Sequence, residues 1–185
     1  MQRKTRDLVL AGLFIALGIL LPLVFHLFGQ AAGQVFLPMH IPVLLAGFFL
    51  LPGYAAIVGI LAPLLSSVLT GMPPLYPMAP LMAVELCVYG LAASLAYRWL
   101  VQKDVKKVVS VVLSLVIAMA AGRAAAGLGV WTLVGLFSAR MPSPLGYITG
   151  GIVTGLPGII IQIVLVPVIV LAVQSFGKKS NNRLS

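Results

Sequence analysis

The chain has 185 residues, of which 61% are hydrophobic and only 8% charged. Soluble domains average about 45–50% apolar and about 25% charged residues, so a soluble fold of this composition would lack the polar side chains to cover its surface. Lipid must therefore surround most of the molecule. The length and the long apolar runs predict a single membrane domain over residues 1–185, with a basic flank at 1–7 and a basic tail at 177–185.

The formal net charge of +9 is segregated along the chain. Ten of the twelve basic residues flank apolar runs: Arg3, Lys4, Arg6, Arg98, Lys103, Lys106, Lys107, Lys178, Lys179 and Arg183. This placement is typical of the positive-inside rule and differs from a basic face interleaved with aromatics, so nucleic-acid binding is excluded. The single cysteine, Cys87, rules out an intrachain disulfide and a cysteine metal cluster, and is expected to be a small buried hydrophobe.

Charged, proline-rich and glycine-rich interruptions divide the apolar sequence into six predicted transmembrane helices, since a span needs about 20 apolar residues. They cover approximately residues 8–28, 39–51, 54–70, 81–101, 108–137 and 147–176. The first is too long for a signal-peptide core and is expected to be retained. The second is short, so we expect it to tilt little, to lie beside a re-entrant connector or to begin earlier. Gly122, Gly127 and Gly129 are expected to break or loosen the fifth.

Six helices place both termini on one side of the membrane together with the charged loop 102–107, which the positive-inside rule makes the cytoplasmic side. The loops 29–38, 71–80 and 138–146 then face outward, with Arg140 as their one basic residue. No internal repeat is evident, which gives no support to an inverted-repeat transporter.

Two charges fall inside predicted spans, Glu85 in the fourth helix and Arg123 in the fifth. A charge at the bilayer centre costs at least about 2.5–3.5 kcal/mol and usually faces a cavity or a partner. Both positions are expected in the outer half of the membrane. Either they form a structural pair, or at least one of them binds a polar ligand.

Other polar residues gather at the predicted outer ends of the helices. His40 either lies at the interface or lines an outward cavity, and nothing in its spacing suggests a metal site. The hydroxyls of Ser66 and Thr70 either bond back to the backbone carbonyls four residues earlier or face a ligand. In the stiff apolar loop that follows, Met72 and Tyr76 either close over an organic ligand or belong to a rigid turn.

The first helix contains Gly12 and Ala16, a small-xxx-small pattern that permits close helix packing, either within the bundle or against a partner. Nucleotide-binding loops, nucleophile elbows and paired catalytic carboxylates are missing from the sequence. The chain is therefore predicted not to be an enzyme and to need no cofactor, and any ATP hydrolysis must take place in another subunit.

The whole chain resembles the substrate-binding S components of energy-coupling factor (ECF) vitamin transporters. Three stretches carry the resemblance: Leu37 to Gly47 (LPMHIPVLLAG), Gly59 to Pro63 leading to Leu65 to Pro74 (LSSVLTGMPP), and Glu85 to Gly90 (ELCVYG). The resemblance implies a multi-pass protein of the prokaryotic cytoplasmic membrane that binds a vitamin from outside. It also implies three partners, a transmembrane coupling subunit and two cytoplasmic ATPases.

In this family an Ala-x-x-x-Ala pattern of the first helix packs on the coupling subunit, and Gly12 and Ala16 occupy that pattern here with Gly in the first place. The resemblance also implies an outward cavity near His40, Ser66, Thr70, Met72, Tyr76, Glu85 and Arg123. An unpaired Arg123 would suit a carboxylate, which favours pantothenate ahead of cobalamin and folate. The competing hypothesis is a self-sufficient secondary transporter that uses Glu85 as its proton carrier.

Overall fold

The computed structural model describes residues 2–137 and 141–181, and this part of the chain is all-helical. Six of its helical segments are long and apolar enough to cross a membrane, which confirms the predicted fold class. The helices are α1 (Gln2–His26), α2 (Gln30–Phe36), α3 (His40–Phe49), α4 (Pro52–Thr70), α5 (Met78–Gln102), α6 (Lys107–Phe137), α7 (Pro144–Thr154) and α8 (Leu156–Asn181).

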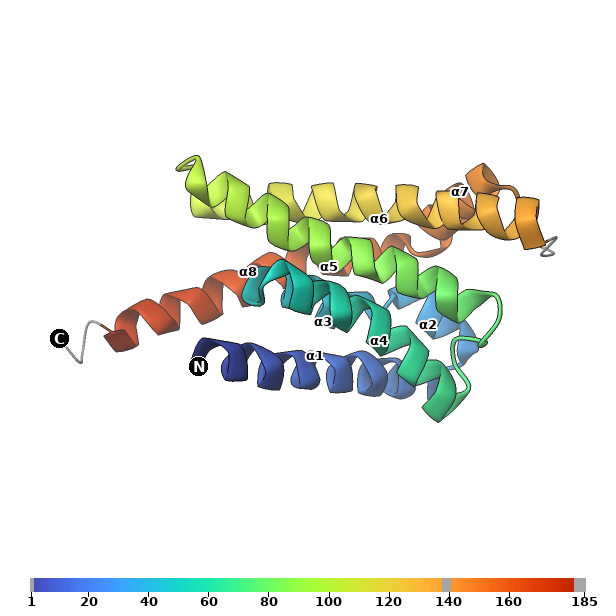
Figure 1. Ribbon diagram of the computed structural model, residues 1–185, viewed down its shortest axis with the longest axis horizontal. Coiled ribbons are helices and arrows are strands. Elements are labelled where there is room, and N and C mark those ends of the chain that lie inside the picture. Colours follow the sequence, from blue (N-terminus) through green and yellow to red (C-terminus); the bar gives the residue numbers. More distant parts are fainter. Residues whose placement is uncertain (1, 138–140, 182–185) are drawn as a thin grey trace.

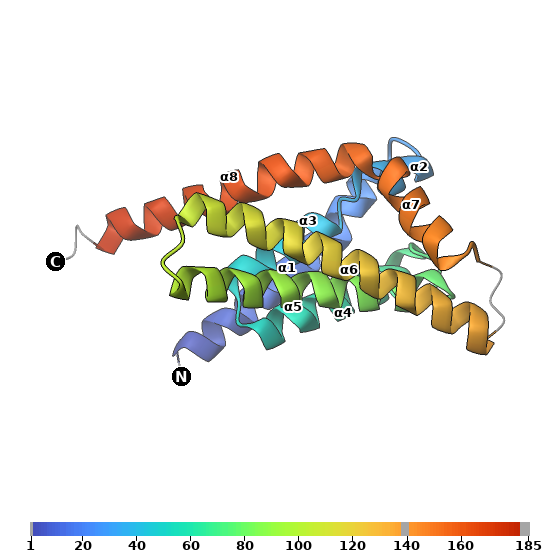
Figure 2. The same cartoon turned by 90° about the horizontal axis from the view of Figure 1, so that it is seen from above.

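Helix α3 lies at the centre of the bundle (Figures 1 and 2). It packs against α1, α4, α5 and α8, and eight of its ten residues are buried. Val43, Leu44 and Ala46 have no exposed surface at all. By contrast, large apolar side chains on the outer faces of α1, α6 and α8 are exposed, as Leu8, Leu128 and Val164 illustrate. This distribution suits a bundle whose solvent is lipid.

Close contact between α4 and α5 depends on two glycines. A Cβ atom added to Gly59 would overlap the backbone carbonyl of Leu86, and one added to Gly90 would lie 2.5 Å from the carbonyl oxygen of Ala55. Backbones that approach this closely pack well without a hydrophobic driving force, which is how helices associate in lipid. Helices α4 and α5 are therefore packed rigidly against each other. Glu85 is the residue before Leu86, whose backbone contacts Gly59.

Both views show that α1 begins and α8 ends at one end of the bundle, where the α5–α6 connection also lies (Figures 1 and 2). We call this the basic end, because Lys103 and Lys106 belong to that connection and Lys107 begins α6. The opposite end, which we call the loop end, holds α2, α7 and the α4–α5 loop (Figures 1 and 2). The shared end agrees with the predicted topology, whereas the side of the membrane that each end faces stays a prediction.

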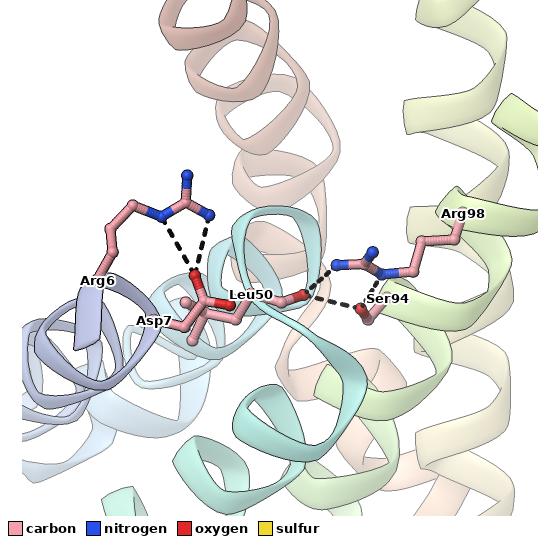
Figure 3. Close-up of polar contacts among 5 residues, drawn as sticks. All are labelled: Arg6, Asp7, Leu50, Ser94 and Arg98. Atoms are coloured by element: carbon pink, nitrogen blue, oxygen red, sulfur yellow. Dashed lines mark hydrogen bonds and ion pairs between the residues drawn. The ribbon is translucent and has the colours of Figure 1, made fainter. Parts of the chain in front are cut away.

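At the basic end, polar side chains complete the C-terminus of α3 (Figure 3). The carbonyl of Leu50 accepts hydrogen bonds from Ser94 Oγ at 3.0 Å and from Arg98 Nη2 at 2.9 Å, and Arg98 Nε also donates to Ser94 Oγ at 3.2 Å. The last carbonyls of a helix have no partner inside the helix. Arg98 therefore ties α3 to α5 and serves as more than a solvated flanking charge. Beside this cap, the buried carboxylate of Asp7 accepts from Arg6 at 2.9 Å.

The first predicted helix begins earlier than expected, at Gln2, and the second, fifth and sixth also differ from expectation. The second span begins earlier, as one alternative allowed, because α2 and α3 together supply the apolar segment Ala31–Phe49. The fifth helix was expected to be broken or loosened at its glycines, and the break is wrong, since α6 runs without interruption. Glycine costs a helix about 1 kcal/mol relative to alanine, but tertiary packing outweighs this here.

The sixth predicted helix starts earlier than residue 147 and is divided in two. Ser143 accepts a hydrogen bond from the amide of Gly146, and Pro144 occupies the first helical turn, so α7 starts with an N-cap signal. The division falls at Gly155, since Pro157 lacks the N–H that would bond to the carbonyl of Val153. Arg140 lies outside the described residues.

Candidate functional site

Glu85, Arg123 and His40 form a buried polar cluster between α5, α6 and α3. Arg123 Nη1 lies 3.0 Å from Glu85 Oε1, and His40 Nε2 lies 3.8 Å from the same oxygen. The side chains of Glu85 and His40 are 3% and 4% exposed, and that of Arg123 is 12% exposed. The two intramembrane charges thus pair with each other, which was one of the two alternatives from the sequence.

Two glycines explain why Arg123 can reach this position. A Cβ atom on Gly122 would lie 3.1 Å from both the carbonyl oxygen of Glu85 and the ring of Tyr89, so α6 approaches α5 closely at that residue. The next residue, Arg123, is then beside Glu85. On the other side, a Cβ atom on Gly151 would lie 3.1 Å from Arg123 Nη1. Helix α7 therefore covers the guanidinium with its backbone.

Two tyrosines that the sequence analysis did not single out complete the cluster. The ring of Tyr89 meets His40 edge to face, with 5.3 Å between centroids. A signal was available, because residues four apart share a helix face and Tyr89 follows Glu85 by four. Tyr147 is on α7, where burial and then the charge of Glu85 raise its pKa to about 12, partly offset by Arg123. It is therefore a neutral hydroxyl at physiological pH.

Several buried polar atoms of this cluster have no hydrogen-bond partner among the described residues. They are His40 Nδ1 and Nε2, Glu85 Oε1 and Arg123 Nη2. The approach of Glu85 to Arg123 is thus an ion pair without an aligned hydrogen bond. Buried polar groups are nearly always hydrogen-bonded, and exceptions require an explanation. Together these atoms offer both donors and acceptors to a polar ligand. In the part of the chain that the structure describes, no group of three or more His, Cys, Asp or Glu could hold a metal ion.

The hydroxyls of Ser66 and Thr70, near the end of α4, form hydrogen bonds with nearby backbone atoms. Ser66 Oγ donates to the carbonyl of Met72 at 2.7 Å, and Thr70 Oγ1 donates to the carbonyl of Ser66 at 2.7 Å. Thr70 Oγ1 also accepts from the amide of Met72 at 3.2 Å. Thr70 thus bonds to the carbonyl four residues earlier, as one alternative stated, whereas Ser66 bonds forward to Met72, which neither alternative described. All these bonds end within residues 66–72. Ser66 and Thr70 therefore fix the conformation at Met72.

The remaining predicted site residues lie at different depths. Met72 is partly buried, whereas Tyr76, which also belongs to the loop between α4 and α5, is 59% exposed. No described hydrogen bond or ion pair joins this loop to the ionic cluster. The structure therefore brings His40, Glu85 and Arg123 together, and leaves the loop residues as a separate group at the loop end.

Gly12 and Ala16 are both exposed on the outer face of α1. A Cβ atom on Gly12 would meet nothing within 4 Å, so this small-residue pattern packs against no other helix of the bundle. Of the two alternatives, packing within the bundle is therefore ruled out for Gly12. The outer face of α1 around Gly12 and Ala16, which also carries exposed leucines and valines, is therefore not covered by another helix of the bundle.

The fold and the cluster define a multi-pass membrane protein with a buried, charge-paired polar site. Residues 6–170 match the family model of the substrate-specific component of ECF transporters. The chain belongs to this family, whose members are substrate-binding subunits of a cell-membrane transporter and associate with an ECF module. No curated protein and no solved structure matches the chain.

Proposed function

We propose that the chain binds a water-soluble vitamin or vitamin precursor from outside for ATP-driven import, and that the cluster of His40, Glu85 and Arg123 is the binding site. The observation that carries the proposal is the group of buried donors and acceptors without partners in this cluster. Such a group is costly in a dry interior unless something binds to it. In a substrate-binding subunit, the substrate is the natural partner.

Pantothenate is our first candidate, ahead of cobalamin and folate. The sequence argument for a carboxylate required an unpaired Arg123, and the 3.0 Å ion pair with Glu85 removes that support. Pantothenate remains attractive because it also carries two hydroxyls and an amide, which match a mixed set of donors and acceptors.

Ser66 and Thr70 act in this proposal by holding Met72 and the loop in place, and Tyr76 by covering the ligand from outside.

Import further requires partners, which we propose to be a transmembrane coupling subunit and two cytoplasmic ATPases. The exposed face of α1 around Gly12 and Ala16 fits the coupling subunit, since small residues permit close approach of a second helix. The basic end would face the cytoplasm, because Lys103, Lys106 and Lys107 lie there. The loop end, with the α4–α5 loop, would face outward.

The source of driving force tests this function. Vesicles that contain the complete complex are loaded with or without internal ATP, and vitamin uptake is measured at zero and at an imposed proton gradient. We expect uptake only with ATP and no response to the gradient. Gradient-driven uptake without ATP would instead favour the self-sufficient carrier with Glu85 as its proton carrier, and would overturn the proposal.

The α4–α5 loop gives a second prediction. Replacing residues 72–78 by a Gly/Ser linker of equal length should raise the dissociation rate of the vitamin more than it lowers the association rate. The reason is that the rigid loop holds the ligand by contacts made after entry, and such contacts mainly affect dissociation. Stopped-flow or surface-based kinetics on the purified protein would measure both rates. An unchanged dissociation rate would show that the loop is only a turn.

A further inference from the structure

The ionic cluster also restricts what part of the ligand it can receive. We propose, resting on the proposed function, that the cluster of His40, Glu85 and Arg123 binds an uncharged donor–acceptor group such as a hydroxyl or an amide. A ligand that carries a carboxylate would keep that charge away from the cluster, toward the loop end.

When the His40 ring is neutral, the charges of the cluster already balance. Arg123 and Glu85 contribute one charge of each sign at 3.0 Å, and both side chains are largely buried. The nearby Tyr147 stays neutral, because its pKa is raised to about 12. The other Asp, Lys and Arg side chains that the structure describes are on α1, near the end of α5, in the α5–α6 connection or at the start of α6, at the basic end. A ligand carboxylate placed here would therefore leave one uncompensated negative charge in a dry setting.

The unpaired atoms are of both kinds. Arg123 Nη2 is a donor, Glu85 Oε1 is an acceptor, and a neutral His40 ring has one donor and one acceptor nitrogen. A carboxylate offers acceptors only, so it would satisfy the donors but could donate no hydrogen bond to Glu85 Oε1, which forms none in the ion pair. A hydroxyl or a primary or secondary amide offers both functions in a small volume. The set of atoms therefore matches an uncharged polar group.

Exchange of partners would not remove the problem. If a ligand carboxylate displaced Glu85 from Arg123, Glu85 would stay buried with only His40 at 3.8 Å. Removing the partner of a buried charge is strongly unfavourable. The backbone of α7 at Gly151 also lies against the guanidinium, which limits how far Arg123 can turn toward a new partner on that side. The Glu85–Arg123 ion pair is therefore expected to stay intact when the ligand binds.

The test compares matched ligands on the purified full-length protein. A panel of vitamins is first screened by thermal shift and titration calorimetry, and each acid that binds is then compared with its alcohol or amide derivative, such as pantothenate with pantothenol. We expect the two affinities to agree within about threefold, a difference below the roughly tenfold that 1.4 kcal/mol represents. Tight binding of a vitamin without a carboxylate would also support the inference.

Glu85→Gln supplies an independent comparison, because it leaves the site with one net positive charge. We expect this variant to prefer the acid over its uncharged derivative by about tenfold or more, the low end of a charge-assisted hydrogen bond. If the variant fails to fold, the comparison on the unaltered protein still decides. If the unaltered protein bound the uncharged derivative about thirtyfold or more weakly than the acid, this inference would be overturned and the proposed function would stand. Failure of the folded protein to bind any vitamin would overturn the proposed function and this inference with it.

Discussion

Replacing Arg123 by glutamine is expected to lower the free energy of unfolding by about 3–5 kcal/mol, because it leaves Glu85 as an uncompensated buried charge. The size of the effect follows from the burial of both side chains, which are 12% and 3% exposed, and from their 3.0 Å separation. Surface ion pairs typically contribute only about 0–1 kcal/mol. Thermal and denaturant unfolding of the ligand-free protein in detergent would measure the change.

The matched control is the double variant Glu85→Gln with Arg123→Gln, which removes both charges and leaves a neutral polar side chain at each position. We expect it to recover most of the lost stability, since the penalty of a broken buried pair comes mainly from the charge left behind. Equal destabilisation in the single and the double variant would show that the two residues do not act as a pair. A single variant as stable as the unaltered protein would contradict the buried geometry itself.

Replacing both Gly12 and Ala16 by leucine should reduce ATP-dependent uptake by about tenfold or more, whereas vitamin binding to the isolated protein in detergent should stay within about twofold. Both residues are exposed on α1, and a side chain at Gly12 would meet no atom of this protein within 4 Å. Added bulk therefore leaves the bundle intact and blocks only close approach of another helix. Uptake by the reconstituted complex and calorimetry on the purified chain measure the two effects separately.

Gly135 offers the control for this experiment. It is an exposed helical glycine on α6, and a Cβ atom there would also meet nothing within 4 Å. Gly135→Leu should leave uptake unchanged, because it adds similar bulk to a different outer face. If the Gly12/Ala16 variant transported normally, the proposed contact with the coupling subunit would be wrong. If both variants lost uptake equally, a general effect of exposed bulk would explain the result.

Much of the architecture was predictable from the order of residues alone. Apolar runs of about 20 residues and clusters of Lys and Arg are properties of the linear sequence, so six spans and the segregation of charge could be read directly from it. Glu85 and Arg123 were recognised as unusual for the same reason, because a charge inside an apolar run is visible without any coordinates. The helix limits at Gly155 and Pro144 were missed, although Pro157 and the Ser143–Pro144 pair carried local signals for them.

Which side chains lie next to one another could only come from the tertiary structure. His40, Glu85, Arg123 and Tyr147 are on four different helices, and their meeting depends on backbone approaches at Gly122 and Gly151 that no linear pattern specifies. In the structure, the hydroxyls of Ser66 and Thr70 donate to the backbone carbonyls of Met72 and Ser66, and Gly12 lies free on an outer face. The hydrophobicity of a segment is a sum over its residues, so it can be read from the sequence alone. Ion pairing and close packing depend on distances between residues far apart in the chain, and these exist only after folding.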